Sequence, residues 1–586
     1  MKQISTVPRG TGWALYFFLL LLRFVLVWRV QPGYIHPDEF FQSVEISAGD
    51  VYGLEVFRSW EFLPHGCGPL RSIAGIGPVA HLPIWLYKRL LDGAVNLTHV
   101  SRGGSDLLTR IIFPVRLMTA VGSLWVDLFV LFGSAHLRSP YGRKRRCFLS
   151  ASPPIALIIY ASCTFGGLLY AGRTIANAWE TAAAATFGLF SLVIIRKAQY
   201  MAATSYTCDA ICICILMCLQ AAFSTWAIFL RFTYPLFILP LALVEMAALW
   251  RKSRVISLIP CSLSILVAAL SLHLCLLVDT AYYKNISFSH LYSNWSLSDL
   301  VCVPCRFFAY NSNSIHLAEH GLHPRYLHLL VNLPLIIGPV VVLLALYPPK
   351  QFFSVHCLFW LCVVVPLAIL STVPHQEARF LMPLIPFVAI LAGDRLEALL
   401  ASPRKSNLSH LWRSKWGTFI TFCWFIQQTT LLLLFGMLHQ GGLVRYFKSL
   451  QPPVSSDCQS YIFYHTYMPP RFPFGRYSPS ILGNHCNKVT DLMGSDSSRL
   501  RHTLQRLRDS NALPTSGQLL AHVIYPGSLS PLNLNLTEFG AILATQLFFG
   551  HLSLENLPHL PPTNQVGDYS YWYSQLSLHV VSLVLR

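Results

Sequence analysis

The chain has 586 residues, of which 54% are hydrophobic and only 12% are charged, and its formal net charge is +18. Soluble domains carry about 25% charged residues. The composition therefore excludes an ordinary water-soluble protein, and its hydrophobicity excludes a disordered chain. We predict a polytopic membrane protein whose basic excess lies in cytoplasmic loops, and no nucleic-acid partner.

Apolar stretches of about 18–25 residues predict membrane-spanning helices. The first stretch contains Arg23 and lacks a clear small-residue cleavage site, so we expect an uncleaved first helix. The eleven predicted spans, in chain order, are 12–30, 112–136, 147–170, 174–195, 203–221, 223–249, 255–279, 326–347, 352–373, 379–400 and 416–438.

Clusters of Lys and Arg predict the orientation of the spans. Eleven spans and a cytoplasmic N-terminus place every basic loop on the cytoplasmic side. These loops are 138–146, 196–197, 251–254 and 404–405. The same count places 31–111, 280–325, 374–378 and the tail from 439 on the opposite side of the membrane.

The predicted topology divides the chain into four parts. Residues 1–30 form the first helix, 31–111 a long loop, 112–438 a helical bundle, and 439–586 a small C-terminal region. The last segment, 571–586, alternates partly between apolar and polar residues, which is typical of a strand.

Sequons and cysteines provide a check on this topology. Four sequons fall on the non-cytoplasmic side and are predicted glycosylation sites: Asn96, Asn285, Asn294 and Asn535. A fifth, Asn407, falls on the cytoplasmic side and should stay unmodified. Five cysteines share the non-cytoplasmic side, where disulfides can form: Cys67, Cys302, Cys305, Cys458 and Cys486. For Cys302 and Cys305, a structural pair and free thiols both remain open.

The first long loop opens with two adjacent carboxylates, Asp38 and Glu39, directly after Pro37. Proline followed by acidic residues is typical of a helix start, which is one interpretation. The other is a site, because a carboxylate held at a membrane surface can act as a general base. In a helix, Asp38, Gln42 and Glu45 would share one face.

A second constellation, His375-Gln376-Glu377-Ala378-Arg379-Phe380, occupies the very short loop between two predicted spans. Charged groups at this depth must face a polar cavity, lipid headgroups or one another. Arg379 could bind a phosphate through its planar guanidinium. The alternative is an internal ion pair between Glu377 and Arg379.

Two further arginines lie in apolar surroundings. Arg173 precedes Asn177 by four residues, so the two would share a helix face. Arg231 falls inside a predicted span, where a charged residue indicates a functional site. The alternative for Arg231 is a side chain that extends to the membrane interface.

No metal site is predicted. His316, His320 and His323 could share a helical face, but a zinc site there would need further ligands. No Gly-rich phosphate loop of the Walker type occurs, which disfavours an ATP-driven pump.

Two of these motifs resemble those of a known family. His36-Pro37-Asp38-Glu39 followed by Phe-Phe-Gln-Ser, and His375-x-Glu377-x-Arg379-Phe380, are similar to the signatures of the dolichol-phosphate-mannose-dependent mannosyltransferases of the endoplasmic reticulum, glycosyltransferase family 22. Many relatives carry Lys where this chain has Gln376. Three shorter motifs resemble the subgroup that adds a fourth mannose to the glycosylphosphatidylinositol (GPI) precursor: 231–235, 439–442 and 465–470.

The resemblance implies an all-α membrane fold of the GT-C type and an active site on the lumenal side of the endoplasmic reticulum membrane. It implies transfer of mannose from dolichyl-phosphate-mannose to the third mannose of a GPI glycolipid, through an α-1,2 linkage and by inverting single displacement. No cofactor is implied, and the use of a divalent metal stays open.

The resemblance also implies roles for individual residues. Asp38 would be the base with Glu39 assisting, and His375, Arg379 and Arg173 would hold the donor phosphate. The supporting residues would be His36, Gln42, Glu377 and Arg231.

Alternative functions remain at this stage. Within the enzyme class, these are transfer of the third GPI mannose or of a mannose to the asparagine-linked lipid precursor. Outside it, they are a lipid-sugar transporter and a non-catalytic subunit of a glycosylation complex.

Overall fold

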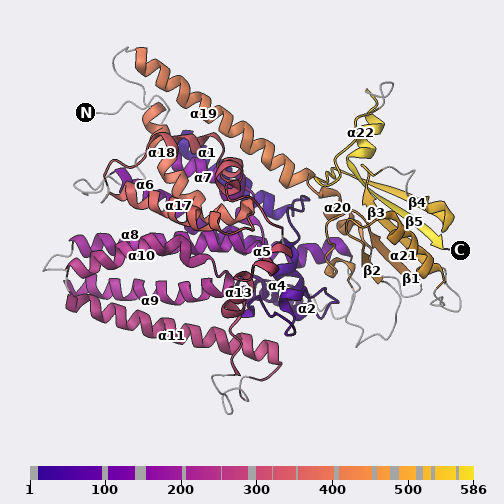
Figure 1. Cartoon of the computed structure of the whole chain (residues 1–586), viewed down its shortest axis with the longest axis horizontal. Coiled ribbons are helices and arrows are strands. Elements are labelled where there is room, and N and C mark those ends of the chain that lie inside the picture. Colours follow the sequence, from indigo (N-terminus) through magenta and orange to yellow (C-terminus); the bar gives the residue numbers. More distant parts are fainter. Residues whose placement is uncertain are drawn as a thin grey trace. The chain divides into compact units, whose positions relative to one another are not determined.

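The structure is a computed structural model of the whole chain (Figure 1). It describes residues 11–94, 103–138, 153–200, 206–252, 254–287, 289, 299–319, 321–351, 354–400, 408–451, 458–475, 488–509, 519–529, 535–561 and 567–585.

The chain divides into two compact units. Unit 1 comprises Met1–Trp28, Ser59–Val79 and Arg116–Thr429, and unit 2 comprises Arg29–Arg58, Ala80–Val115 and Thr430–Arg586. The long first loop predicted at 31–111 is thus shared between the two units.

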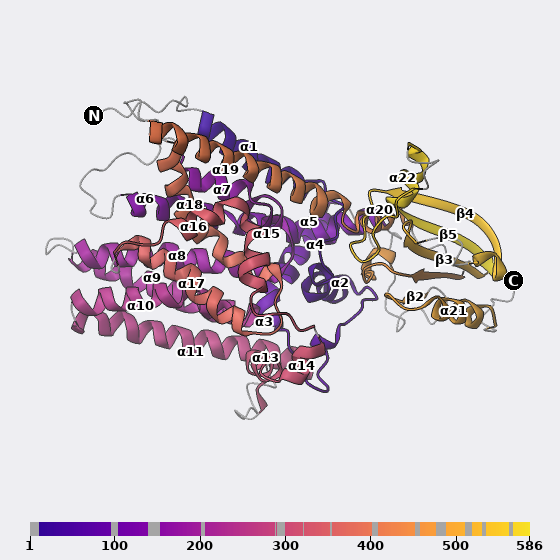
Figure 2. The same ribbon diagram turned by 45° about the horizontal axis from the view of Figure 1, so that its top comes forward.

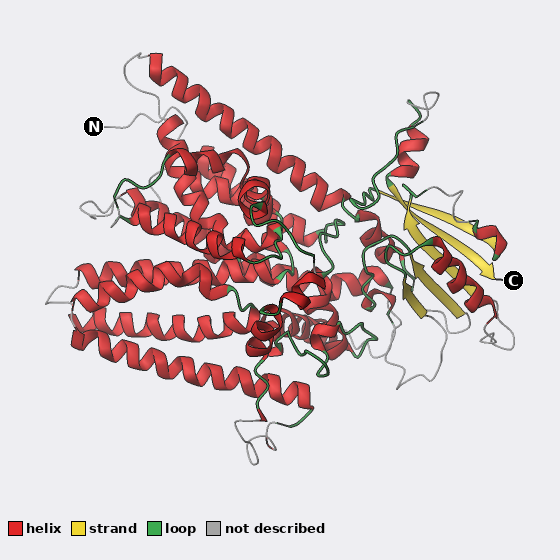
Figure 3. Ribbon diagram, viewed as in Figure 1, coloured by secondary structure: helices red, strands yellow, loops and turns green. Residues whose placement is uncertain are grey.

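Every regular element in the described part of unit 1 is a helix (Figure 3). Helices α8 to α11 run side by side (Figures 1 and 2). The α-helices are α1 (Thr11–Trp28), α3 (Ile73–Ile76), α6 (Leu124–Arg138), α7 (Ile155–Ser162), α8 (Ala176–Tyr200), α9 (Tyr206–Leu230), α10 (Tyr234–Lys252), α11 (Arg254–Lys284), α13 (Val303–Asn311), α14 (Ser314–Glu319), α15 (Leu333–Ile337), α16 (Val341–Leu346), α17 (Val355–Thr372), α18 (Ile385–Leu400) and α19 (Leu408–Leu433). Short 3-10 or π segments are η2 (Trp60–Phe62), η4 (Thr164–Leu168), η5 (Tyr170–Gly172), η7 (His328–Asn332), η8 (Gly338–Val340) and η9 (Ala378–Leu384).

The prediction of a polytopic membrane protein is confirmed. Among the described residues, eight helices are long and apolar enough to cross a membrane, or nine if the bent pair α7 and Thr164–Gly172 counts as one span. The apolar part of α1, Gly12–Trp28, is shorter than these, and the predicted span 379–400 opens with the 3-10 segment η9. The exact number of eleven spans therefore stays a prediction.

The predicted boundary between the spans 203–221 and 223–249 is wrong. Helix α9 continues to Leu230, and the break falls at 231–233, before α10 begins at Tyr234. Pro235 in the first turn of α10 explains the break, because proline fits a helix start and disfavours helical geometry in the residue before it. Arg231 thus lies in a turn between two helices, and the prediction that it lies inside a span is wrong.

Arg23 is fully buried inside the first apolar helix. Its guanidinium lies 2.7 Å from the Asp127 carboxylate of α6 and donates a hydrogen bond of 2.9 Å to the Ser123 hydroxyl. Because an unpaired charge in this environment is costly, the pair explains how the helix tolerates an arginine and holds α1 against α6.

Unit 2 combines short helices with a sheet. Its helical elements are η1 (Phe40–Val44), α2 (Glu45–Tyr52), α4 (Leu82–Ala94), η10 (Leu434–Leu438), α20 (Gly441–Ser449), η11 (Phe472–Phe474), α21 (Ser497–Asp509), η13 (Leu536–Glu538) and α22 (Tyr569–Gln575). Three of the described helical elements begin in one unit and end in the other: η3 (Gly77–His81), α5 (Gly104–Gly122) and α19 (Leu408–Leu433). Aromatic and aliphatic side chains of the first loop, α5, α20 and the C-terminal region form one buried core.

The C-terminal region contains a five-stranded sheet with the order β2-β1-β3-β5-β4. The strands are β1 (Cys458–Phe463), β2 (Lys488–Asp491), β3 (Leu519–Pro526), β4 (Gly540–Phe549) and β5 (Ser577–Leu585). The three strands β2, β1 and β3 are parallel, and β5 is antiparallel to both β3 and β4. The strand predicted at 571–586 is confirmed for β5 but wrong for 571–575, which belong to α22 (Tyr569–Gln575).

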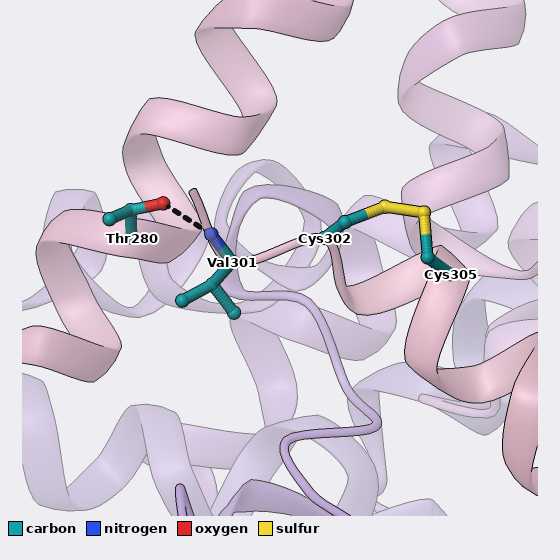
Figure 4. The surroundings of a disulfide bond; sticks show 4 residues. All are labelled: Thr280, Val301, Cys302 and Cys305. Carbon is teal, nitrogen blue, oxygen red and sulfur yellow. Dashed lines mark hydrogen bonds between the residues drawn. A yellow bond between two sulfur atoms is a disulfide. The ribbon is translucent and has the colours of Figure 1, made fainter. Parts of the chain in front are cut away.

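Cys302 and Cys305 form a disulfide at the start of α13 (Figure 4). The neighbouring Val301 amide donates to the Thr280 hydroxyl of α11 at 2.8 Å, which fixes this turn to the helix before it. Of the other cysteines predicted on this side, Cys67 is an exposed thiol, whereas Cys486 and the side chain of Cys458 lie outside the described residues.

Two of the predicted glycosylation sites, Asn285 and Asn535, have exposed side chains, as a modified asparagine needs. Asn96, Asn294 and Asn407 lie outside the described residues.

Candidate active site

The segment His36–Glu45 of unit 2 forms a helical start that also presents Asp38. The Phe40 and Phe41 amides donate to the Pro37 carbonyl, at 3.0 and 3.1 Å, and the chain continues into η1 and α2. The Asp38 amide donates to Nδ1 of His36 at 3.1 Å. These hydrogen bonds confirm the interpretation of this segment as a helix start.

Burial separates the two adjacent carboxylates. The Asp38 side chain retains 24% of its exposure, accepts a hydrogen bond from the Gln42 amide, and lies 3.5 Å from Nδ1 of His36. The neighbouring Glu39 is completely buried. The Asp38 carboxylate is therefore partly exposed at the surface, whereas Glu39 lies beneath it.

Glu45 has a structural position. It accepts hydrogen bonds from two backbone amides, that of Phe57 at 3.0 Å and that of Arg471 at 2.7 Å. Burial raises the pKa of the Glu45 carboxyl to about 7, against the lowering effect of these amides. Its bonds join α2 to two loops of unit 2.

Two of the shorter motifs meet next to the first loop within unit 2. Nε2 of His439 lies 3.1 Å from the Tyr467 hydroxyl, and the His439 carbonyl accepts from the Tyr34 amide at 2.9 Å. The Tyr34 ring packs edge-on against both Tyr467 and Phe40. The residues 439–442 and 465–470 thus support the base of the segment that carries Asp38.

The turn 374–378 of unit 1 brings three ionisable side chains together. Glu377 lies between two cationic groups, with Oε2 at 2.6 Å from Nε of Arg379 and Oε1 at 3.0 Å from Nε2 of His375. Hydrogen bonding to Glu377 raises the pKa of His375, although burial acts in the opposite direction. The predicted alternative of an internal ion pair is thus present in the structure.

Gln376 points away from this ion cluster. Its carboxamide oxygen accepts from the His328 amide at 2.9 Å, and its nitrogen donates to the Ser371 and Val373 carbonyls, both at 3.1 Å. The side chain is 2% exposed. Gln376 holds the turn against η7. A glutamine in place of a lysine at this position therefore does not alter the ion pairs among His375, Glu377 and Arg379.

Arg231 contributes to the same region of unit 1 from the turn between α9 and α10. Its Nε lies 3.1 Å from Oε2 of Glu180, and its guanidinium lies over the Phe380 ring at 5.4 Å. The Arg379 guanidinium lies over the same ring at 5.8 Å. Two arginines, each with a carboxylate partner, therefore share one aromatic side chain.

Arg173 is fully buried and directly follows η5, three residues before α8 begins. Its backbone is extended and α8 begins at Ala176, so the prediction that Arg173 and Asn177 share a helix face is wrong. Asn177 instead donates to Glu180 at 3.3 Å, one turn along α8.

No metal centre is found in the part of the chain that the structure describes, where no group of three or more His, Cys, Asp or Glu could hold an ion. His316 and His323 belong to that part, and His320 lies outside it.

Sequence reasoning assigned no role to Glu180, Thr233 or Phe380. The sequence could have indicated Glu180 as a partner of Arg231. An arginine in apolar surroundings requires a carboxylate, and few carboxylates occur in the predicted spans. The same reasoning could not identify Phe380, because a phenylalanine beside a membrane span usually packs in the hydrophobic core.

Comparison with known proteins identifies the family. A model of the Alg9-like mannosyltransferase family matches residues 14–468. The chain belongs to the Alg9-like mannosyltransferase family. It is 29% identical to the human protein named GPI alpha-1,2-mannosyltransferase 4, over 96% of this chain and 92% of that protein. Proteins named GPI mannosyltransferase 4 from Yarrowia lipolytica (26% identity, 93% of this chain and 96% of that protein) and Candida albicans (26%, 84% and 87%) are also similar.

Among solved structures, ArnT from Cupriavidus metallidurans matches in its apo state with a TM-score of 0.46 and 13% identity, over 98% of both chains. Membership of the Alg9-like family makes the chain a glycosyltransferase that transfers mannose, and the transporter and non-catalytic alternatives are set aside.

Proposed function

We propose that the protein transfers the fourth mannose of a GPI precursor from dolichyl-phosphate-mannose to the 2-hydroxyl of the third mannose. The observation that supports this most strongly is the similarity to human GPI alpha-1,2-mannosyltransferase 4 over nearly the full length of both chains. The location would be the endoplasmic reticulum membrane, with the reaction on the lumenal side.

The chemistry is a single displacement. The acceptor oxygen attacks the anomeric carbon of the donor, the bond from that carbon to the phosphate oxygen breaks, and dolichyl phosphate leaves. The hydroxyl proton goes to a base, for which Asp38 is suited by its partial exposure and its contact with the Gln42 amide. Glu39 and His36 support that carboxylate.

The leaving phosphate requires stabilisation of its negative charge. His375, Arg379 and Arg173 are assigned to this role, with Glu377 and Arg231 supporting them. The raised pKa of His375 keeps its imidazole cationic to a higher pH than usual, which favours a bound anion. Side chains alone can provide this charge, and no metal or other cofactor is assigned.

The test is chemical analysis of lipid-linked glycans in cells that lack this chain. Accumulation of a GPI precursor with three mannoses, reversed by re-expression, would support the assignment. A two-mannose GPI precursor or a truncated asparagine-linked precursor would overturn it in favour of a different acceptor.

A further inference from the structure

The end of the last apolar helix is joined to a later segment of unit 2. This helix is long and apolar enough to cross a membrane over Lys415–Leu438. The Leu552 amide donates to the Leu438 carbonyl at 2.8 Å, and the Leu552 carbonyl accepts from the Gln440 amide at 3.0 Å. Because both bonds are made at the last residues of the span, Leu552 lies at the level where the chain leaves the membrane.

A short arm, residues 552–561, begins at this point. Three of its leucines, spaced three residues apart, have exposed side chains: Leu554 (48%), Leu557 (59%) and Leu560 (86%). Two residues of chain span at most about 7 Å, and the headgroup layer on each side of a bilayer is about 5–8 Å thick. The first exposed leucine of the arm is therefore within the depth of the headgroup layer from the end of the span.

Contacts with α22 give the arm a fixed shape. The His559 amide donates to the Gln575 side chain at 3.1 Å, and the Tyr571 hydroxyl donates to the His559 carbonyl at 3.3 Å. Helix α22 stands out from the sheet (Figures 1 and 2), and four of its seven residues are Tyr or Trp. Tyr569, at its start, is 74% exposed. The arm and α22 thus present leucine and tyrosine side chains together.

The composition of this surface is that of a membrane interface. Tyrosine and tryptophan place an apolar ring and a polar group at the level of the headgroups, and leucine inserts below them. Neither the arm nor α22 contains a lysine or an arginine, the residues that attract anionic headgroups. The surface therefore fits zwitterionic lipid.

We propose that the arm and α22 form an interfacial anchor of unit 2. Leu554, Leu557, Leu560 and Tyr569 insert into the leaflet at which the last span ends, and zwitterionic lipid covers them. The anchor concerns the membrane and not the reaction, so it does not depend on the proposed function.

The experiment places a photo-crosslinking amino acid at single positions of the purified full chain in phosphatidylcholine nanodiscs. Leu557 is the test position. Leu543 on β4 is the matched control, because it is a leucine of similar exposure (61%) that lies six strand residues, roughly 20 Å, from Phe549 at the end of β4 that leads into the arm. Phe422 of α19, an exposed side chain within the last span, is the positive control.

Mass spectrometry of the labelled peptides should find lipid adducts at Leu557 and Phe422 and none at Leu543. The pair Leu554→Asp and Leu560→Asp should remove most of the lipid adduct at Leu557, because a charged side chain enters lipid at a high cost. Leu543→Asp should leave that adduct unchanged. Melting temperatures equal to that of wild type would show that these exposed substitutions preserve the fold.

An adduct at Leu557 to a second copy of this chain or to another protein, without lipid, would overturn the anchor and make the surface a protein interface. The lack of any adduct at Leu557 beside a lipid adduct at Phe422 would show that the arm faces water. Equal lipid adducts at Leu557 and Leu543 would also overturn the anchor, since contact would then not depend on the arm.

Discussion

The carboxylates of the two candidate regions have different neighbours. In the segment His36–Glu45 of unit 2, Asp38 contacts the Gln42 amide and lies near His36, and Glu45 binds two backbone amides. In the turn 374–378 of unit 1, Glu377 lies between an arginine and a histidine. Amide groups donate to Asp38 and Glu45 in the first region, whereas an arginine and a histidine contact Glu377 in the second.

We propose that this difference separates two tasks within one reaction. A carboxylate beside an amide remains able to take a proton, whereas one between two cations is stabilised as an anion. Under the proposed function, the first region would accept the hydroxyl proton, and the second would bind the negative charge that grows on the leaving phosphate. The predictions that follow test this division, beginning with the largest effect.

Asp38→Asn should reduce mannosyl transfer by a factor of about 100 or more, because the amide cannot accept the proton of the acceptor hydroxyl. The measurement is the rate of product formation under saturating donor and acceptor. Asp50→Asn is the control, since Asp50 lies on α2 and pairs with Arg58 at 2.7 Å. Near wild-type transfer by a folded Asp38→Asn protein would remove Asp38 from the role of base.

Glu45→Ala should destabilise the fold by about 2–4 kcal/mol, because it leaves the Phe57 and Arg471 amides without their acceptor. Thermal unfolding in detergent would show the loss, and Glu45→Gln, which keeps an acceptor oxygen, should cost much less. Equal melting temperatures for Glu45→Ala and wild type would show that these amides find other partners, and Glu45 would lose its structural role.

Arg379→Ala should raise the KM for the donor by roughly tenfold, the scale of one lost charge-assisted contact to phosphate. The acceptor KM should change little. Arg395→Ala serves as the matched control, because Arg395 also stacks on an aromatic ring, that of Tyr347 at 5.6 Å, but on the far part of α18. A donor KM that stays the same would exclude Arg379 from the phosphate site.

The sequence predicted the elements that depend on local pattern and missed those that depend on distant partners. Long apolar runs defined the helical bundle, and the motifs identified Asp38 and Arg379 as candidates. The break at Arg231 was missed because the apolar pattern continues through it, although Pro235 marked the helix start. The pairing of Arg231 with Glu180 joins residues 51 positions apart in sequence, and no spacing rule connects them.

The raised pKa of Glu45 predicts that acid conditions stabilise this part of unit 2. Between pH 4.5, its ordinary value, and about 7, the unfolded chain has lost the proton that the folded chain keeps. The unfolded state binds fewer protons there, so the contribution of this group to the free energy of unfolding falls as pH rises through that window. Comparison of melting temperatures at several pH values should show a smaller slope in Glu45→Gln than in wild type. Identical slopes would contradict the pKa shift.

The smallest expected effect concerns the pH profile of donor use. Hydrogen bonding to Glu377 raises the pKa of His375, so the cationic imidazole is present below that raised value and is lost as pH rises through it. In Glu377→Gln the carboxylate is absent, and the pKa of His375 should fall toward its ordinary value. The basic limb of kcat/KM for the donor should therefore move to lower pH. A basic limb that stays in place would exclude His375 as the cation that the donor requires.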